Sequence, residues 1–318
     1  MSRAVLTIEH AGPLTTVQDA GRPGYARFGV TTAGPMDRLA HATANVAIGN
    51  PEGASAIETA LGGITVVVSE GSIAIAVAGG APVVTIDGTR VEAWSVQILS
   101  RNDRLAIRPG RWGSWTYLAI AGTLPAKRWL GSTATHAQSG FGGRNMAAAD
   151  TLVIDDARSR PVAPRNLPLP VGARPRQDVR VVLGPQDRFF SSAVQQSFLS
   201  GVYTVTDAYD RMGMRLGGPK LAISGSLDML SEAIVRGSVQ VPGHGDPIVL
   251  LADHQTTGGY PKIATVIAAD QDGLAQLRPR DHLTFRAVSP EQAVAAARIR
   301  HRQTRAYLQA VSDKGSRQ

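Results

Sequence analysis

Short runs of Val, Ile, Leu and Ala, separated by Gly, Asp and Asn at close intervals, dominate this sequence. Such runs are shorter than the helices of globular proteins, and their β-branched residues favour strands. In the first half we expect strands at residues 4–10, 64–68, 73–77, 83–86, 94–99, 104–107, 115–120 and 151–154. In the second half we expect strands at residues 179–183, 203–205, 221–223, 238–241, 248–251, 263–267 and 282–287.

Helical periodicity is restricted to three stretches. In the first, residues 37–48, Asp37 is placed to cap the amino-terminal end and Gly49 follows the last helical residue. Further helices are expected at residues 187–199 and 290–309. Because helices are few and do not alternate with strands, we expect a mainly β protein in which each half forms a barrel or a sandwich.

A segment rich in proline and arginine interrupts the strand pattern between Arg158 and Asp178. Neither a helix interior nor a central strand accommodates so many prolines. We therefore predict an N-terminal domain at residues 1–160, a linker at 161–177, a C-terminal domain at 178–289, and a C-terminal helix with a basic tail at 290–318. Both domains have ordinary sizes.

Composition excludes several classes of chemistry and location. The chain has no cysteine, which excludes disulfides, thiolate metal sites and cysteine nucleophiles. Its seven histidines show no metal-binding spacing, so no metal is expected. Charged residues interrupt the first thirty positions, so we expect neither a signal peptide nor a membrane span, and a cytoplasmic location.

The formal net charge of +8 comes largely from two clusters of basic residues, at 158–180 and 298–317. Proteins that bind single-stranded nucleic acids interleave basic and aromatic side chains so that bases can stack. Neither cluster contains that pattern. We therefore interpret both as solvated connecting or terminal segments and expect no nucleic-acid partner.

Three segments, at residues 15–22, 210–216 and 240–262, combine glycine with polar side chains more densely than an ordinary core or surface does. Glycine lets the backbone approach a ligand closely, although it also simply makes turns. The polar members that we single out are Gln18, Asp19 and Arg22, then Arg211 and Arg215, then Gln240, Asp253, Gln255, Thr256, Tyr260 and Lys262.

In this order and spacing, the three segments resemble the signatures of a carboxyltransferase-domain family. The family occurs in the C subunit of 5-oxoprolinase, which has long been labelled allophanate hydrolase subunit 2. It also occurs in urea carboxylases, which depend on biotin and are related to urea amidolyase. The resemblance extends from Thr15 to near Pro290. It implies two cyclophilin-like β-barrel domains in tandem.

The resemblance also implies a function. It points to a subunit of an ATP-dependent 5-oxoprolinase, a hydrolase that opens the cyclic amide of 5-oxoproline to give glutamate and is active only as a complex. The first implied partner is a homologue of the B subunit, which is of the allophanate hydrolase subunit 1 type. The two would form a heterodimer or a higher hetero-oligomer. The second implied partner is a third subunit that handles the lactam. The alternatives are an allophanate or urea amide hydrolase or carboxyltransferase subunit, and a regulatory protein that binds a homologue of a kinase inhibitor.

Such an enzyme must hold an amide or lactam and stabilise negative charge on its oxygen. We accordingly predict Lys262, Gln255 and Asp253 as catalytic residues, with Asp253 either a base or an organiser of its own loop. The predicted substrate-binding residues are Arg211, Arg215, Gln240, Thr256, Tyr260, Gln18, Asp19 and Arg22.

Several of these residues also have structural interpretations. Arg211 and Arg215, in an expected turn around Gly213, would clamp an anion or form an ion pair with Asp207, Asp210 or Glu232. Asp19 and Arg22 would line a cleft or form a local salt bridge. Three further polar residues would brace the first helix: Asn45, Asn50 and Glu58.

Some expected motifs are absent, and some positions depart from the family pattern. The sequence has no G-x-x-x-x-G-K-[ST] loop, so the ATP used by the complex must bind without a P-loop of this chain. It also has no Met-Lys-Met biotin-attachment site, so any biotin must be carried by another chain. Residues 131–135 read Gly-Ser-Thr-Ala-Thr where an Arg and a second Ser are expected, and His254 stands where Arg is frequent. Either change would take away a charge that could contact the substrate, so a shift of substrate and a loss of activity both stay open as alternatives.

Overall fold

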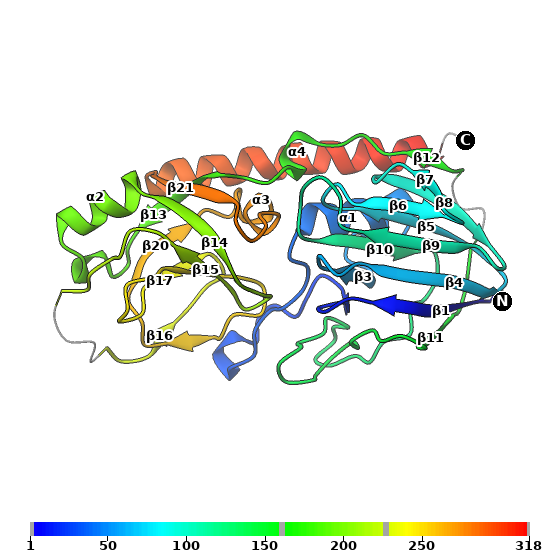
Figure 1. Cartoon of the computed structure of the whole chain (residues 1–318), viewed down its shortest axis with the longest axis horizontal. Coiled ribbons are helices and arrows are strands. Elements are labelled where there is room, and N and C mark those ends of the chain that lie inside the picture. The colour runs from blue at the N-terminus through cyan, green and yellow to red at the C-terminus, as the bar shows by residue number, and fades with distance from the viewer. Residues whose placement is uncertain (1–2, 159–162, 225–228, 317–318) are drawn as a thin grey trace. The chain divides into compact units, whose positions relative to one another are not determined.

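The chain divides into two compact units. The computed structural model describes residues 3–158, 163–224 and 229–316 (Figure 1). Unit 1 comprises Met1–Arg22, Asp37–Arg174 and Thr304–Gln318, and unit 2 comprises Pro23–Met36 and Pro175–Gln303. Unit 2 therefore includes a short segment from the amino-terminal part of the sequence.

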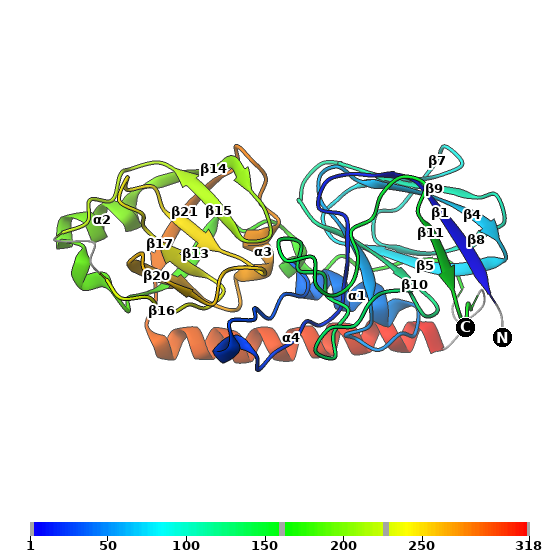
Figure 2. The same cartoon turned by 90° about the horizontal axis from the view of Figure 1, so that it is seen from below.

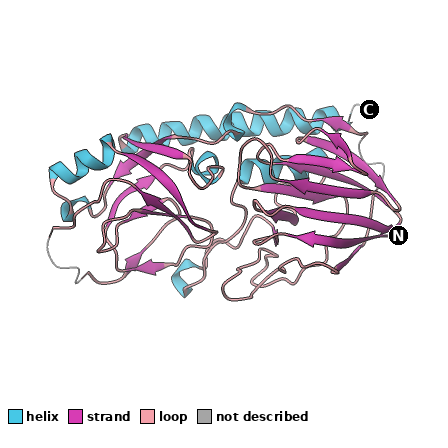
Figure 3. Ribbon diagram, in the orientation of Figure 1, coloured by secondary structure: helices cyan, strands magenta, loops and turns pink. Residues whose placement is uncertain are grey.

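Unit 1 contains two six-stranded antiparallel sheets (Figure 3). The first has the order β11-β1-β4-β9-β6-β7, from β1 (Ala4–Ala11), β4 (Ile64–Glu70), β6 (Val83–Ile86), β7 (Thr89–Val91), β9 (Arg104–Arg108) and β11 (Thr151–Ile154). The second has the order β12-β8-β5-β10-β3-β2, from β2 (Thr16–Gln18), β3 (Ala56–Thr59), β5 (Ser72–Ala78), β8 (Ser95–Ser100), β10 (Thr116–Ile120) and β12 (Arg165–Asn166). Every strand predicted for the first half is present, whereas β2, β3, β7 and β12 were not predicted.

The inner faces of the two sheets share one core. Side chains from the first sheet, such as Ile8 and Val66, belong to the same buried cluster as Ile75 and Leu118 from the second. Burial of aliphatic side chains of this size stabilises a fold by about 1.5–3 kcal/mol each. The apolar runs that predicted the strands thus also supply the faces that meet.

Helix α1 (Arg38–Ala47) packs against β10 and β5 of the second sheet (Figure 2). The predicted cap is confirmed, because the Asp37 carboxylate accepts a hydrogen bond of 3.0 Å from the backbone N–H of Ala40. This helix buries the outer face of β5, which explains why that strand reads as a continuous apolar run.

Unit 2 contains a closed seven-stranded barrel in the order β13-β20-β17-β18-β15-β14-β21. Its strands are β13 (Asp178–Leu183), β14 (Val202–Tyr209), β15 (Gly213–Gly217), β17 (Ser238–Gln240), β18 (Ile248–Leu250), β20 (Lys262–Val266) and β21 (His282–Ala287). The first and last strands, β13 and β21, pair in parallel, whereas the other neighbours are antiparallel. A separate two-stranded ribbon joins β16 (Glu232–Ala233) to β19 (Thr257–Gly258). The prediction of a mainly β fold is confirmed.

The remaining elements of unit 2 correct three predictions. The predicted helix at 187–199 is divided into η3 (Asp187–Phe189) and α2 (Ser192–Ser200), because Ser191 starts a new helix by accepting a hydrogen bond from Val194 N. The expected turn around Gly213 is strand β15. Residues 221–223, predicted as a strand, are irregular.

The other helices are short, apart from the last. They are η1 (Ala26–Phe28), η2 (Val171–Ala173), α3 (Gln271–Ala275) and α4 (Pro290–Ser316). Helix α4 is longer than the predicted 290–309, and its residues up to Gln303 belong to unit 2. No helix in the described ranges is both long enough and apolar enough to cross a membrane.

Candidate functional site

A buried lysine at the start of β20 lies opposite a buried glutamine of β17. Lys262 and Gln240 are register partners, and the two residues are 3% and 1% exposed. Lysine is seldom buried so completely without a partner. Within the part of the chain that the structure describes, neither Lys262 Nζ nor Gln240 Nε2 has a hydrogen-bond partner. Two buried donors on adjacent strands therefore have unused hydrogen-bonding capacity.

Glu232 supplies the nearest counter-charge. Its Oε2 atom lies 3.5 Å from Lys262 Nζ, beyond the length of a strong charged hydrogen bond. The Glu232 side chain is 47% exposed, so the pair has one buried and one solvated member. The ammonium group is thus partly neutralised but keeps N–H groups that can bind a ligand oxygen.

Gln186 holds this pair in place. Its Oε1 accepts a hydrogen bond of 2.9 Å from the backbone N–H of Lys262, and its Nε2 donates to Glu232 Oε2. Gln186 is itself buried. Sequence reasoning named neither Gln186 nor Glu232 as a site residue. The one available signal was that Gln186 immediately follows a Gly-Pro pair before an expected helix.

The ribbon of β16 and β19 brings the third glycine-rich segment to the same place. Its register sets Glu232 opposite Gly258. The exposed Gln255 donates a weak hydrogen bond of 3.4 Å from Nε2 to Gln240 Oε1. A Cβ atom added at Gly258 would lie 2.9 Å from Gln240 Nε2 and 2.5 Å from Ile234 Cδ1. A larger residue here would displace the ends of the Ile234 and Gln240 side chains. The structure brings Lys262, Gln240 and Gln255 together.

Arg211 and Asp253 form a buried, bidentate ion pair. Arg211 Nε and Nη2 each lie 2.8 Å from a carboxylate oxygen of Asp253, and Nη2 also donates to Gly34 O at 2.7 Å. The ion-pair alternative thus describes Arg211, but with Asp253 rather than Asp207, Asp210 or Glu232. The pair ties together three distant segments of unit 2, so Asp253 organises the loop that carries Gln255.

The other predicted residues of unit 2 are more peripheral. Arg215 is exposed on β15, Tyr260 is 47% exposed, and Thr256 uses its carbonyl to accept a hydrogen bond from Ile234 N. His254 contacts the carbonyl of Gln255 through Nδ1 at 2.6 Å. Burial lowers the pKa of this imidazole, and nearby Arg236 lowers it further. Among the described residues, none of these four side chains hydrogen-bonds to Lys262, Gln240 or Glu232.

Asp19 lies in unit 1, where it organises an irregular segment. Its Oδ1 accepts hydrogen bonds from Gly21 N at 2.9 Å and from Ser132 Oγ at 2.5 Å, and its Oδ2 accepts from Thr133 N at 2.7 Å. With three donors bound, the carboxylate anchors residues 132–133 beside strand β2.

Gln18 and Arg22 anchor the next two residues of that segment. Gln18 Nε2 donates to Thr135 O at 3.1 Å, and Arg22 Nη2 donates to Ala134 O. The Arg22 guanidinium also stacks over the ring of Trp129, 5.0 Å from its centroid. Gln18, Asp19 and Arg22 therefore act together on residues 132–135 within unit 1.

Asn45, Asn50 and Glu58 make structural contacts near α1, as the interpretation that they brace this helix requires. Asn45 Nδ2 donates to Ala54 O at 2.9 Å, and Asn50 Nδ2 donates to Ile120 O at 3.0 Å. Glu58 accepts a hydrogen bond of 2.7 Å from the Tyr117 hydroxyl, whose pKa burial and the Glu58 charge raise well above the usual value.

No group of three or more acidic or histidine side chains in the described ranges is arranged to hold a metal ion.

Comparisons with known proteins agree with the fold. Residues 28–287 match the family described as carboxyltransferase domain, subdomain A and B. The chain is 36% identical over 287 residues to the C subunit of 5-oxoprolinase from Haemophilus influenzae, covering 89% of this chain and 91% of that protein. It is 33% identical over 302 residues to the C subunit of 5-oxoprolinase from Escherichia coli, covering 94% and 96%.

Two solved structures resemble this chain over most of its length. The crystal structure of TTHA0988 matches with a TM-score of 0.79 and 32% identity, covering 89% of this chain and 55% of that one. The K. lactis urea amidolyase matches with a TM-score of 0.86 and 25% identity. That alignment covers 96% of this chain but only 20% of the amidolyase, so this chain corresponds to a small part of the larger enzyme.

Proposed function

Since this chain belongs to the family of carboxyltransferase domains with subdomains A and B, we propose that it is a subunit of an ATP-dependent 5-oxoprolinase, active only with partner proteins. Support comes from two relatives named as the C subunit of 5-oxoprolinase, which it matches over nearly their whole length. A protein named as a subunit acts within a complex. The proposed partners are a homologue of the B subunit and a third, lactam-handling subunit, with the complex located in the cytoplasm.

The observation that carries the proposal is the pair of unused buried donors at Lys262 and Gln240. Opening a lactam requires attack at the carbonyl carbon, which places negative charge on the carbonyl oxygen before the C–N bond breaks. Fixed donors directed at that oxygen stabilise the charge, and each such donor typically contributes 10²–10³-fold in rate. In this proposal, the Lys262 ammonium and the Gln240 amide bind the oxygen.

The neighbouring residues take supporting roles. Glu232, fixed by Gln186, lies 3.5 Å from Lys262 Nζ and is exposed enough to exchange protons with solvent. It would therefore accept a proton from the water that attacks the carbonyl carbon and return it to the ring nitrogen as the C–N bond breaks. Gln255, on the loop held by the Arg211–Asp253 pair, would orient the substrate amide. We assign no role in nucleotide binding to this chain, and the ATP is consumed elsewhere in the complex.

A second candidate reaction is carboxyl transfer to a urea-type amide. It is favoured by the likeness to K. lactis urea amidolyase, which extends over 96% of this chain. The same two donors suit a urea oxygen as well as a lactam oxygen. This reaction needs a biotin carrier on another chain, because the sequence has no Met-Lys-Met attachment site.

The test is to measure ATP-dependent glutamate release from 5-oxoproline by this chain alone and by the chain co-purified with the proteins encoded beside it. Release that requires the complete set is expected. Full release by the isolated chain would disprove the partner requirement. A stable complex that releases no glutamate, but carboxylates urea when a biotinylated carrier is added, would support the second candidate instead.

A further inference from the structure

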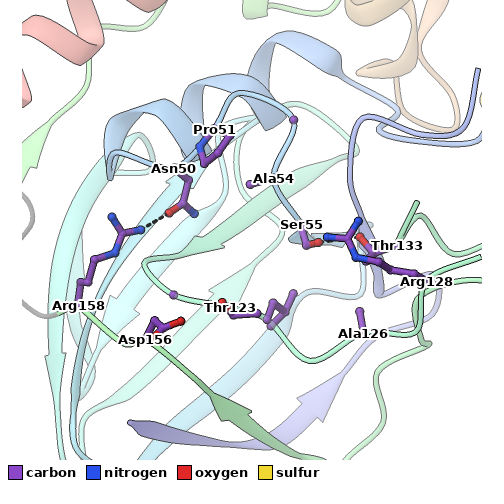
Figure 4. Close-up of a pocket in the computed structure, with 13 residues that line it drawn as sticks. Asn50, Pro51, Ala54, Ser55, Thr123, Ala126, Arg128, Thr133, Asp156 and Arg158 are labelled. Atoms are coloured by element: carbon purple, nitrogen blue, oxygen red, sulfur yellow. Dashed lines mark hydrogen bonds between the residues drawn. The ribbon is translucent and has the colours of Figure 1, made fainter. Parts of the chain in front are cut away.

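A hollow in unit 1 has no part in the function proposed above. It has a volume of about 710 Å³. Pockets that bind small ligands typically have volumes of roughly 300–1,000 Å³. Figure 4 shows Arg158 and Asp156 on one side of this hollow, and Arg128, Ser55 and Thr133 on the other. All of these residues belong to unit 1, whereas the Lys262 cluster belongs to unit 2.

Buried amides hold one wall of the hollow. Arg158 Nη2 donates a hydrogen bond of 2.6 Å to Asn50 Oδ1. Asn50 is 8% exposed and uses its Nδ2 to donate to Asn45 Oδ1 at 3.2 Å and to Ile120 O at 3.0 Å. The exposed Arg158 side chain is therefore oriented by a fixed acceptor, and within the described residues this bond uses one of its five N–H donors.

A pair of hydroxyl groups forms the opposite wall. Ser55 Oγ and Thr133 Oγ1 lie 2.6 Å apart, and the buried Thr133 is held through its backbone N–H by Asp19 Oδ2 at 2.7 Å. One hydrogen atom joins the two oxygens, so the pair retains one O–H donor. Arg128 lines the same side of the hollow (Figure 4), and its Nη1 donates to Gly131 O at 3.1 Å.

The charges that line the hollow select the kind of ligand. Two guanidinium groups face a single carboxylate, that of Asp156, so the lining is net positive. A guanidinium binds a carboxylate or phosphate through two parallel hydrogen bonds, and hydroxyl donors add a third. On the other side, Asp156 and Arg158 together offer an acceptor and a donor, which suits a polar group that has both.

We propose that this hollow binds a small organic anion, with its carboxylate or phosphate at Arg128, Ser55 and Thr133 and its far end at Arg158. Asp19 is a positioning residue for this site, because its carboxylate fixes the segment that presents Thr133. The proposal does not depend on the reaction at Lys262, and its test measures binding alone.

The test titrates the full chain with succinate and, separately, with inorganic phosphate, against chloride at matched ionic strength. Calorimetry measures affinity, and NMR of the Ala54 and Ala126 methyl groups locates the site. In Arg128→Gln we expect affinity to fall at least about tenfold, as a lost charge-assisted hydrogen bond implies. Arg90→Gln, at an exposed arginine of β7 outside the lining, should retain wild-type affinity.

Each outcome decides the proposal. Binding of succinate alone identifies a carboxylate ligand, and binding of phosphate alone identifies a phosphate ester. If neither anion binds more strongly than chloride, the proposal is wrong. It is equally wrong if Arg128→Gln and Arg90→Gln bind alike, or if binding leaves the Ala54 and Ala126 methyl signals unchanged.

Discussion

The ammonium nitrogen of Lys262 lies 3.5 Å from the Oε2 atom of Glu232, although Lys262 is buried and nearly half of the Glu232 side chain is exposed. The asymmetry matters because removing the lysine leaves a carboxylate that water can still solvate. Substitution at Lys262 therefore tests function with little confounding loss of stability.

Lys262→Met should lower ATP-dependent glutamate release by the assembled complex by roughly 10²–10³-fold, because it removes a donor to the developing oxyanion. Assembly, measured by size-exclusion chromatography, should not change. Lys220→Met is the matched control, since Lys220 forms an exposed ion pair with Asp246. Activity within tenfold of wild type in Lys262→Met would contradict the role assigned to this residue.

Gly258→Ala should reduce activity far more than Gly217→Ala. An added Cβ at Gly258 would press on Gln240 Nε2 and Ile234 Cδ1, whereas at Gly217 the nearest atom is 3.8 Å away. Both glycines lie in strands of unit 2. We expect at least a tenfold loss for the first variant, of the order caused by displacing one catalytic contact. Equal activities of the two variants would show that the geometry at Gln240 does not matter.

Arg211→Met should lower the free energy of unfolding by about 3–5 kcal/mol, because it leaves the Asp253 carboxylate buried without its partner. Arg211→Met combined with Asp253→Leu should cost less than the sum of the two single changes. Urea denaturation measures both effects. As a control, Arg286→Met removes the exposed pair with Asp178 and should cost at most about 1 kcal/mol. Additive single effects would show that the buried pair is not coupled.

Stability should fall as the pH is lowered below 6.5, owing to His41. Burial lowers the pKa of this imidazole from 6.5 to about 4. The unfolded chain therefore takes up a proton at a higher pH than the folded chain, and stability present above pH 6.5 is lost as the pH falls toward 4. Between pH 7.5 and 5 this contribution is about 2 kcal/mol.

His41→Gln should remove that part of the pH dependence in urea denaturation, and the exposed His301→Gln should leave it unchanged. Parallel curves for wild type and His41→Gln over this range would show that His41 titrates alike in the folded and unfolded chains.

Eight strands of unit 1 could be predicted because each contains a run of apolar residues, whereas β2, β3, β7 and β12 are only two to four residues long and were not predicted. Strand β15 was missed because glycines at both ends favoured a turn, yet Met214 and Leu216 between them point into the barrel and are fully buried. Residues 221–223 show the reverse error. Leu221 is buried, but its backbone N–H donates to Gly245 O in an irregular segment and not to a strand.

The site was predictable only in part. Lys262, Gln240 and Gln255 lie in one polar, glycine-rich segment, so their grouping could be anticipated from the sequence. Gln186 and Glu232 reach them through the pairing of β16 with β19 and through the contact of Gln186 with β20, which join residues up to 76 positions apart. No local pattern encodes such contacts. The pairing of Arg211 with Asp253 could not be predicted for the same reason. Each residue was predicted to be functional because the sequence does not show that the other neutralises it.

The parallel seam between β13 and β21 has a consequence for how the barrel is made. Residues 178–181 pair with residues 284–287, so β13 cannot complete its pairing until β21 has formed. Folds dominated by such distant pairings fold slowly. During synthesis, β13 and β14 stay open-edged until β21 leaves the ribosome, because β21 pairs with both. A nascent or truncated chain that ends before His282 would therefore expose two unpaired strand edges, the feature that most readily leads to aggregation.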